Sequence, residues 1–152
     1  MTTDVSRSAF SPEASVIARV LRESGAHLTN SATFSKDHAY SALHDVWTET
    51  RKAGWDGADA AGIEQVTYQN ARRFIEALPL GYPLPSAGAE PDGHLTLEWY
   101  LEPKWTLSVS ISPEGTVHYA ALFGNEDPRG SCQFFGEIPE TVLFLIRWVF
   151  YP

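Results

Sequence analysis

The chain has 152 residues, of which 43% are apolar and 20% are charged, values typical of one soluble globular domain that needs no disulfide or metal to fold. Its single cysteine, Cys132, excludes an internal disulfide, and a net charge of −8 disfavours direct binding to nucleic acid. The chain shows no signal peptide and no apolar run of the roughly 20 residues that span a bilayer, so we expect a cytoplasmic protein that does not bind membranes.

The N-terminal half is predicted to be helical after a short arm. Residues 1–10 are polar and without period, which indicates a flexible arm, whereas residues 11–152 are expected to form a single domain. A first short helix is predicted between Ser11 and Gly25. Two longer helices are predicted at about residues 36–53 and 62–78. Their expected core residues are Ala39, Leu43, Val46 and Trp47, then Ile63, Val66, Ala71, Phe74, Ile75 and Leu78.

Two loops flank the third predicted helix. Before it, Trp55, Asp56 and Gly57 are expected to be structural, because Asp can accept hydrogen bonds from backbone amides and Gly can adopt positive φ. A functional role of this loop would require Asp56 or Asp59 to reach a ligand or partner. After the helix, the proline-rich residues 79–85 predict an extended strap that packs on the core, and residues 86–92 predict a loose segment that ends in a turn.

The strongest pattern is the alternation of apolar and polar residues between His94 and Phe123, which predicts three antiparallel strands. Pairing apolar with apolar residues places Leu107 between Trp99 and Ala121. A fourth strand is predicted at residues 131–135, after a polar loop. On the opposite face, the register predicts three rows across the strands: Thr96, Ser110 and His118; Glu98, Ser108 and Ala120; and Tyr100, Thr106 and Leu122.

The last segment, residues 139–151, predicts a helix that is apolar nearly all round, because proline followed by Glu and Thr is typical of a helix start. Its β-branched and aromatic residues leave a strand as the alternative. If it is a helix, then Glu140, Phe144, Arg147 and Tyr151 share its outer face. We regard Phe144, Arg147 and Tyr151 as a candidate contact in a homodimer or with another partner.

The middle third of the chain resembles an uncharacterised family of small bacterial proteins. The pattern is a Trp-Asp-Gly loop, a helix that ends in Leu-Pro, a proline-rich strap, Asp-Gly, and a strand that ends in Glu-Trp. The matching residues here are Trp55, Asp56, Gly57, Leu78, Pro79, Pro83, Pro85, Asp92, Gly93, Glu98 and Trp99. Members usually continue with Tyr-Gly-Ala, where this chain has Ala58, Asp59 and Ala60. The resemblance implies an association with mobile or defence genes and no particular activity.

Motifs for catalysis or cofactor binding are weak. The five histidines lack the spacing of a zinc site, and no glycine-rich phosphate loop follows a strand, so no metal or cofactor is predicted. Ser110, His118 and Glu98 have the residue types of a hydrolase triad, but a flat sheet offers no oxyanion hole. Cys132 is predicted to be a buried small residue without a base beside it.

These observations predict an α+β domain with N-terminal helices packed on a four-stranded antiparallel meander and a C-terminal apolar helix. Residues 74–152 hold ten acidic residues but only Lys104, Arg129 and Arg147 as bases, so a partner with a basic surface is expected. The leading hypothesis is a non-enzymatic protein-binding module that inhibits a bacterial defence or toxin system. The expected contact residues are Glu98, Tyr100, Thr106, Ser108 and His118.

Two alternatives remain open from the sequence. One is an enzyme or small-ligand binder that uses a pocket between the Trp55 loop and the strap at Tyr82. The other is a homo-oligomeric structural protein that associates through the C-terminal helix.

Overall fold

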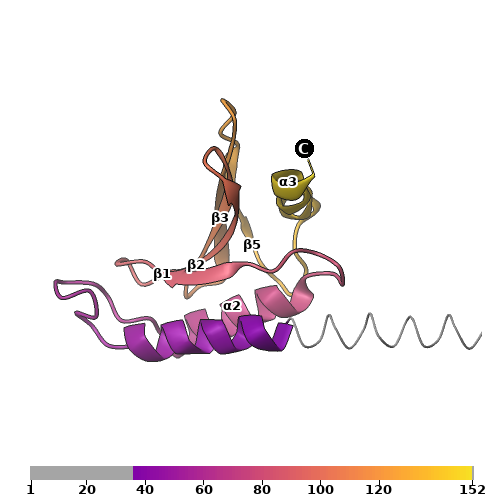
Figure 1. Ribbon diagram of the computed structural model, residues 1–152. Coiled ribbons are helices and arrows are strands. Elements are labelled where there is room, and N and C mark those ends of the chain that lie inside the picture. The colour runs from indigo at the N-terminus through magenta and orange to yellow at the C-terminus, as the bar shows by residue number, and fades with distance from the viewer. Residues whose placement is uncertain (1–35, 152) are drawn as a thin grey trace, which may run out of the picture.

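A five-stranded antiparallel sheet forms the centre of the computed structural model, which describes residues 36–151 (Figure 1). Each strand pairs with the next one along the chain, which makes the sheet a simple meander. The strands are β1 (Ser86–Ala89), β2 (Leu95–Glu102), β3 (Trp105–Ile111), β4 (Thr116–Phe123) and β5 (Arg129–Gln133). The α+β class and the antiparallel meander are therefore confirmed, with five strands in place of four.

The additional strand is β1, in the segment that the sequence analysis predicted to be loose. Residues Ser86 and Ala89 pair with Glu98 and Leu95 of β2. Ser, Ala and Gly have little intrinsic preference for strands, so the local sequence of β1 carries no strand signal. The unpaired backbone groups at the edge of β2 provide the partners that make this segment a strand.

The predicted register of the three central strands is confirmed. Leu107 pairs with Trp99 on one side and with Ala121 on the other, and all three predicted polar rows form as expected. Leu107 and Trp99 are fully buried and Ala121 is nearly so. The β2–β3 turn contains Lys104 with a φ of 69°, in the left-handed region that non-glycine residues seldom adopt.

The last strand begins two residues earlier than predicted. The polar loop turns within residues 124–128, where the amide of Ala121 donates to the carbonyl of Pro128 at 2.9 Å, and pairing starts at Arg129. Gly130 permits this pairing, because a Cβ atom there would lie 2.4 Å from the Tyr119 hydroxyl oxygen. The shift by two residues keeps the alternation of faces, and Phe135 is left outside the strand with 89% of its surface exposed.

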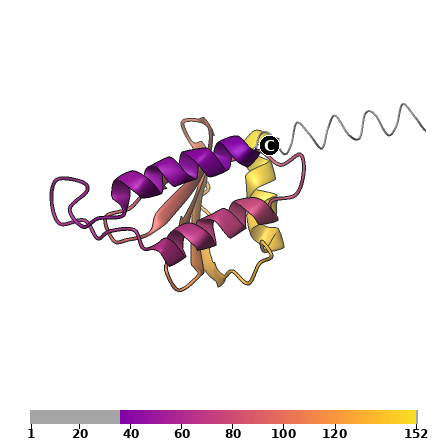
Figure 2. The ribbon, with the colours of Figure 1, turned by 90° about the horizontal axis from the view of Figure 1, so that it is seen from below.

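Helices pack on one face of the sheet. The chain is helical at residues 36–50, in α2 (Gln65–Ala77) and in α3 (Glu140–Phe150). Figure 2 shows the first two helices side by side, and α3 covers another part of the same face. The predicted C-terminal segment is thus a helix. The predicted arm and first helix, at residues 1–25, lie outside the described residues.

The predicted core position of Val66 is wrong. The helix α2 begins at Gln65, not near Gly62, and Val66 in its first turn is 41% exposed while Thr67 is fully buried. Thr67 lies four residues before Ala71 and seven before Phe74, on the same buried stripe of the helix, whereas Val66 is rotated by about 100° from Thr67. The remaining predicted core residues of these two helices are buried or partly buried against the sheet.

Three indole N–H groups hold connecting segments in place. They belong to Trp47, Trp55 and Trp99, which donate to the carbonyls of Ile63, Ala61 and Pro83 at 3.1, 2.9 and 2.8 Å respectively. Each bond gives a backbone carbonyl a donor within the protein, which it would otherwise have to find in water. The strap at residues 79–85 is therefore packed against β2, as predicted.

Within residues 36–151, no helix is long and apolar enough to cross a lipid bilayer.

The face assignment predicts opposite effects of neighbouring substitutions in β3. Leu107→Ala should lower the free energy of unfolding by roughly 2–5 kcal/mol, because it removes a fully buried side chain and leaves a cavity. Ser108→Ala, which changes the other face, should alter it by less than about 0.5 kcal/mol. Urea denaturation followed by circular dichroism measures both values. Equal effects of the two substitutions would contradict the assigned faces.

Candidate binding face of the sheet

The face of the sheet opposite the helices is the candidate site. We call it the open face, because all helices of the described part of the chain pack on the other face (Figure 1). Alternation along each strand places polar and small side chains here. Its central rows hold Thr96, Glu98, Tyr100, Thr106, Ser108, Ser110, His118, Ala120 and Leu122, and the edge strands add Ser86, Arg129 and Ser131.

A cavity of about 610 Å³ lies on the open face. Short side chains from four neighbouring strands form much of its lining, and two oppositely charged residues, Glu90 and Arg129, also contribute. The full lining is Glu90, Thr96, Ser108, Ser110, His118, Tyr119, Ala120, Arg129, Gly130 and Ser131. Hydroxyls, an imidazole and both signs of charge can therefore hydrogen-bond a polar group that enters this cavity.

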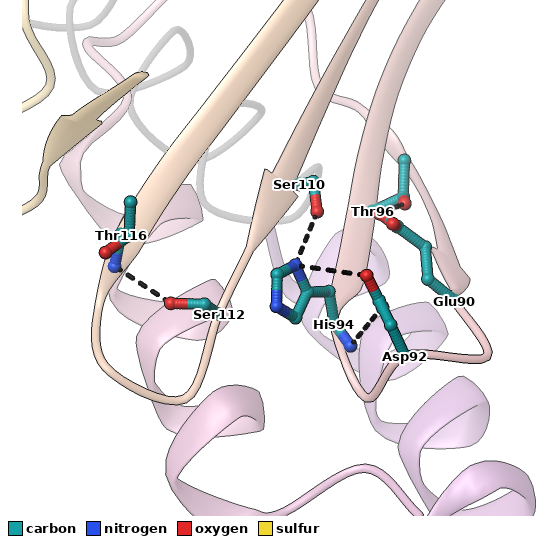
Figure 3. A network of polar contacts seen from close by, with 7 residues as sticks. All are labelled: Glu90, Asp92, His94, Thr96, Ser110, Ser112 and Thr116. Atoms are coloured by element: carbon teal, nitrogen blue, oxygen red, sulfur yellow. Dashed lines mark hydrogen bonds and ion pairs between the residues drawn. The ribbon is translucent and has the colours of Figure 1, made fainter. Parts of the chain in front are cut away.

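The turn between β1 and β2 holds a cluster of polar side chains beside the cavity (Figure 3). His94 Nδ1 lies 3.0 Å from the Ser110 hydroxyl and 3.8 Å from Asp92 Oδ2. The Thr96 hydroxyl donates to Glu90 Oε1. Gly93, with a φ of 96°, makes the turn that brings Glu90, Asp92 and His94 to one side. The His94 ring also stacks on His118, with centroids 5.9 Å apart and planes 8° apart.

This geometry does not form a serine hydrolase triad. Ser110 pairs with His118 across the strands, but its hydroxyl contacts His94. The carboxylate of Asp92 approaches the same ring nitrogen, Nδ1, that contacts Ser110. In a triad the two ring nitrogens have separate partners, the nucleophile on one and the carboxylate on the other. The cluster therefore lacks the relay that would activate Ser110.

The five predicted contact residues all lie on the open face. Ser108 and His118 line the cavity, whereas Glu98, Tyr100 and Thr106 extend toward the β2–β3 turn. Tyr100 is 54% exposed. The sequence analysis missed Glu90, Asp92 and His94, although their alternate spacing in a turn before a strand was a signal that could have been used.

The Trp55 loop is held by its own hydrogen bonds. Asp56 is exposed, and its Oδ1 accepts from the amides of Ala58 and Ala60 at 2.9 and 3.3 Å. A Cβ atom at Gly62 would lie 2.6 Å from the carbonyl oxygen of Arg51, which shows how closely the loop returns to the helix. Asp59 is exposed as well. The carboxylate of Asp56 is thus already used to shape the loop.

The Trp55 loop and the strap at Tyr82 lie at opposite ends of α2, as both ribbon views show (Figures 1 and 2). The 13 residues of this helix extend over about 20 Å. The cavity described above is on the other side of the sheet. The geometry therefore does not favour the pocket that the sequence analysis considered between these two segments.

The predicted partner contact at the C-terminal helix is exposed. Phe144 and Tyr151 of the C-terminal segment are 60% and 73% exposed, and Glu140 and Arg147 are exposed beside them.

Cys132 is partly buried against the core, and this burial raises the pKa of its thiol. A raised pKa reduces the thiolate fraction at neutral pH, which argues against a nucleophilic role.

No family model, curated protein or solved structure matches this chain.

A structural role of Asp56 predicts a difference between the two aspartates of the loop. Asp56→Ala removes the acceptor for two backbone amides and should lower the free energy of unfolding by about 1 kcal/mol. Asp59→Ala is the matched control and should leave stability within about 0.5 kcal/mol. Thermal and urea denaturation measure the two variants. Unchanged stability of Asp56→Ala would contradict the structural role.

Proposed function

We propose that this chain is a protein-binding module that docks its partner on the open face of the sheet. The observation that supports this proposal is the arrangement of the described helices, which all pack on the opposite face. An uncovered face of five strands is about 19 Å across, which is wide enough for part of a standard protein interface.

The chemistry of the open face suits a polar protein surface. Its hydroxyl and imidazole groups can donate and accept hydrogen bonds at little cost in side-chain entropy, since serine and threonine have few rotamers. Tyr100, half exposed beside Glu98, has the properties of an aromatic anchor. The acidic excess of the C-terminal half favours a partner with a basic surface.

The resemblance to small proteins associated with mobile or defence genes suggests the class of partner. We therefore include inhibition of a bacterial defence or toxin protein in the proposal. An acidic inhibitor would associate with the basic active site or nucleic-acid site of such a protein, and the association would weaken as salt screens the charges.

The test is an affinity capture from bacterial lysate with the full chain and two variants. The unmodified chain should retain one stoichiometric protein that dissociates as salt rises. The double variant Glu98→Ala with Tyr100→Ala should reduce the retained amount at least tenfold, because it removes the charge and the anchor. Glu49→Ala, an exposed acid on the helix of residues 36–50, is the control and should bind normally. Mass spectrometry quantifies the retained protein, and equal retention by the double variant would refute the open face as the site.

A second candidate function is homodimerisation through α3. Glu140, Phe144 and Arg147 lie in one exposed stripe, with the acid and the base seven residues apart. If two copies pack their helices antiparallel about a two-fold axis near Phe144, then Glu140 of each copy faces Arg147 of the other. The stripe is therefore complementary to itself.

Charge reversal tests this candidate. The unmodified chain, of 16.8 kDa, should have about twice that mass at micromolar concentration. Arg147→Glu should raise the dissociation constant about tenfold or more, because four acids would then meet at the axis, and Glu140→Arg combined with Arg147→Glu should restore dimerisation. Light scattering coupled to size exclusion measures the mass. A monomer of the unmodified chain would exclude the dimer.

A further inference from the structure

We infer that Glu90, Asp92 and His94 bind a divalent transition-metal ion at the edge of the cavity on the open face. One ligand atom from each of the three side chains lies within 4.8 Å of the other two. All three come from the short connection between β1 and β2, so closing the site needs no movement of one element against another. This inference does not depend on the identity of a protein partner.

The arrangement needs only a small contraction to bind an ion. Ligand atoms at 2.0–2.2 Å from a tetrahedral ion are roughly 3.3–3.6 Å apart, so the atoms here, which lie within 4.8 Å of one another, would have to approach by at most roughly 1.5 Å. Asp92 is exposed and can adjust its rotamer, and His94 and Glu90 are partly buried. Figure 3 shows the carboxylate of Asp92 directed at the His94 ring.

The neighbouring hydrogen bonds support the site. The Thr96 hydroxyl donates to one oxygen of Glu90, which orients this carboxylate and leaves its second oxygen for a metal. The His94 Nδ1 atom is hydrogen-bonded to the Ser110 hydroxyl, a neutral partner that an ion would replace. Among residues 36–151, no lysine or arginine forms an ion pair with Glu90 or Asp92, so their two charges are not neutralised by such a partner.

The ligand set indicates the kind of metal. Calcium and magnesium prefer oxygen ligands alone, whereas one imidazole with two carboxylates suits zinc, cobalt or manganese. Three protein ligands leave at least one coordination position for a further ligand. Because Glu90 also lines the cavity, a polar molecule that coordinates the ion could extend over Ser110 and His118.

The test is a titration of the full chain, first treated with a chelator, with zinc and separately with cobalt. Calorimetry should give one zinc ion per chain with a dissociation constant in the micromolar range or tighter. Cobalt should produce the visible absorption bands of a low-coordination site with nitrogen and oxygen ligands. A hundredfold excess of zinc over the dissociation constant should raise the melting temperature by about 5 °C or more.

Conservative variants assign the ligands. Glu90→Gln and Asp92→Asn keep the acceptors for Thr96 and for the His94 amide, and His94→Ala removes the only nitrogen ligand. Each should weaken zinc binding by 10-fold or more and keep the circular dichroism of the unmodified chain. His38→Ala, an exposed histidine on the helix of residues 36–50, is the control and should bind zinc normally. Binding weaker than about 1 mM, or equal binding by His94→Ala and the unmodified chain, would overturn the inference.

These measurements use the isolated chain and a metal ion alone, so they are independent of partner capture. Loss of zinc binding with retained partner binding would reject the metal site only. Zinc binding without a captured protein would leave the metal site standing and reject the protein-binding proposal.

Discussion

Burial of one face of the β2–β3–β4 meander is the constraint on which the rest of the structure depends. Trp99, Leu107 and Ala121 lie side by side on that face, and the helices cover them. A slip of one residue would place these side chains in water and the serines and threonines in the core. The fold would then lose the stabilisation that comes from burying several apolar side chains. The same constraint therefore determines both the core and the polar composition of the open face.

Several residues of the Trp-Asp-Gly loop, the proline-rich strap and the Glu-Trp strand end serve this packing. Trp99 donates its indole N–H to the carbonyl of Pro83, and this bond ties the strap to β2. Trp55 and Asp56 bond to the backbone of their own loop, and Gly57 adopts a φ of 82° there. The pattern thus describes how the helices, loop and strap are joined to the sheet. Among the residues of this pattern, Glu98 differs because its side chain is on the open face.

Both proposals concern the open face and its rim. The central strands supply neutral hydrogen-bonding groups, while the β1–β2 turn supplies carboxylates and an imidazole close together. A protein partner and a metal ion use different chemistry, and the cavity is adjacent to both sets of groups. Asp92 and Ser110 approach the same ring nitrogen of His94, so these three side chains do not form the relay that would activate Ser110.

The sequence by itself determined the central meander, its register and the open-face residues of its three strands, because alternation with period two leaves one pairing that puts the alternating apolar residues of all three strands on the same face. Only the tertiary structure decided the rest. The strand β1 exists because β2 offers an unpaired edge. The cluster of Glu90, Asp92 and His94 likewise depends on how the turn folds back, since closeness within a turn is a matter of backbone geometry that residue types alone do not specify.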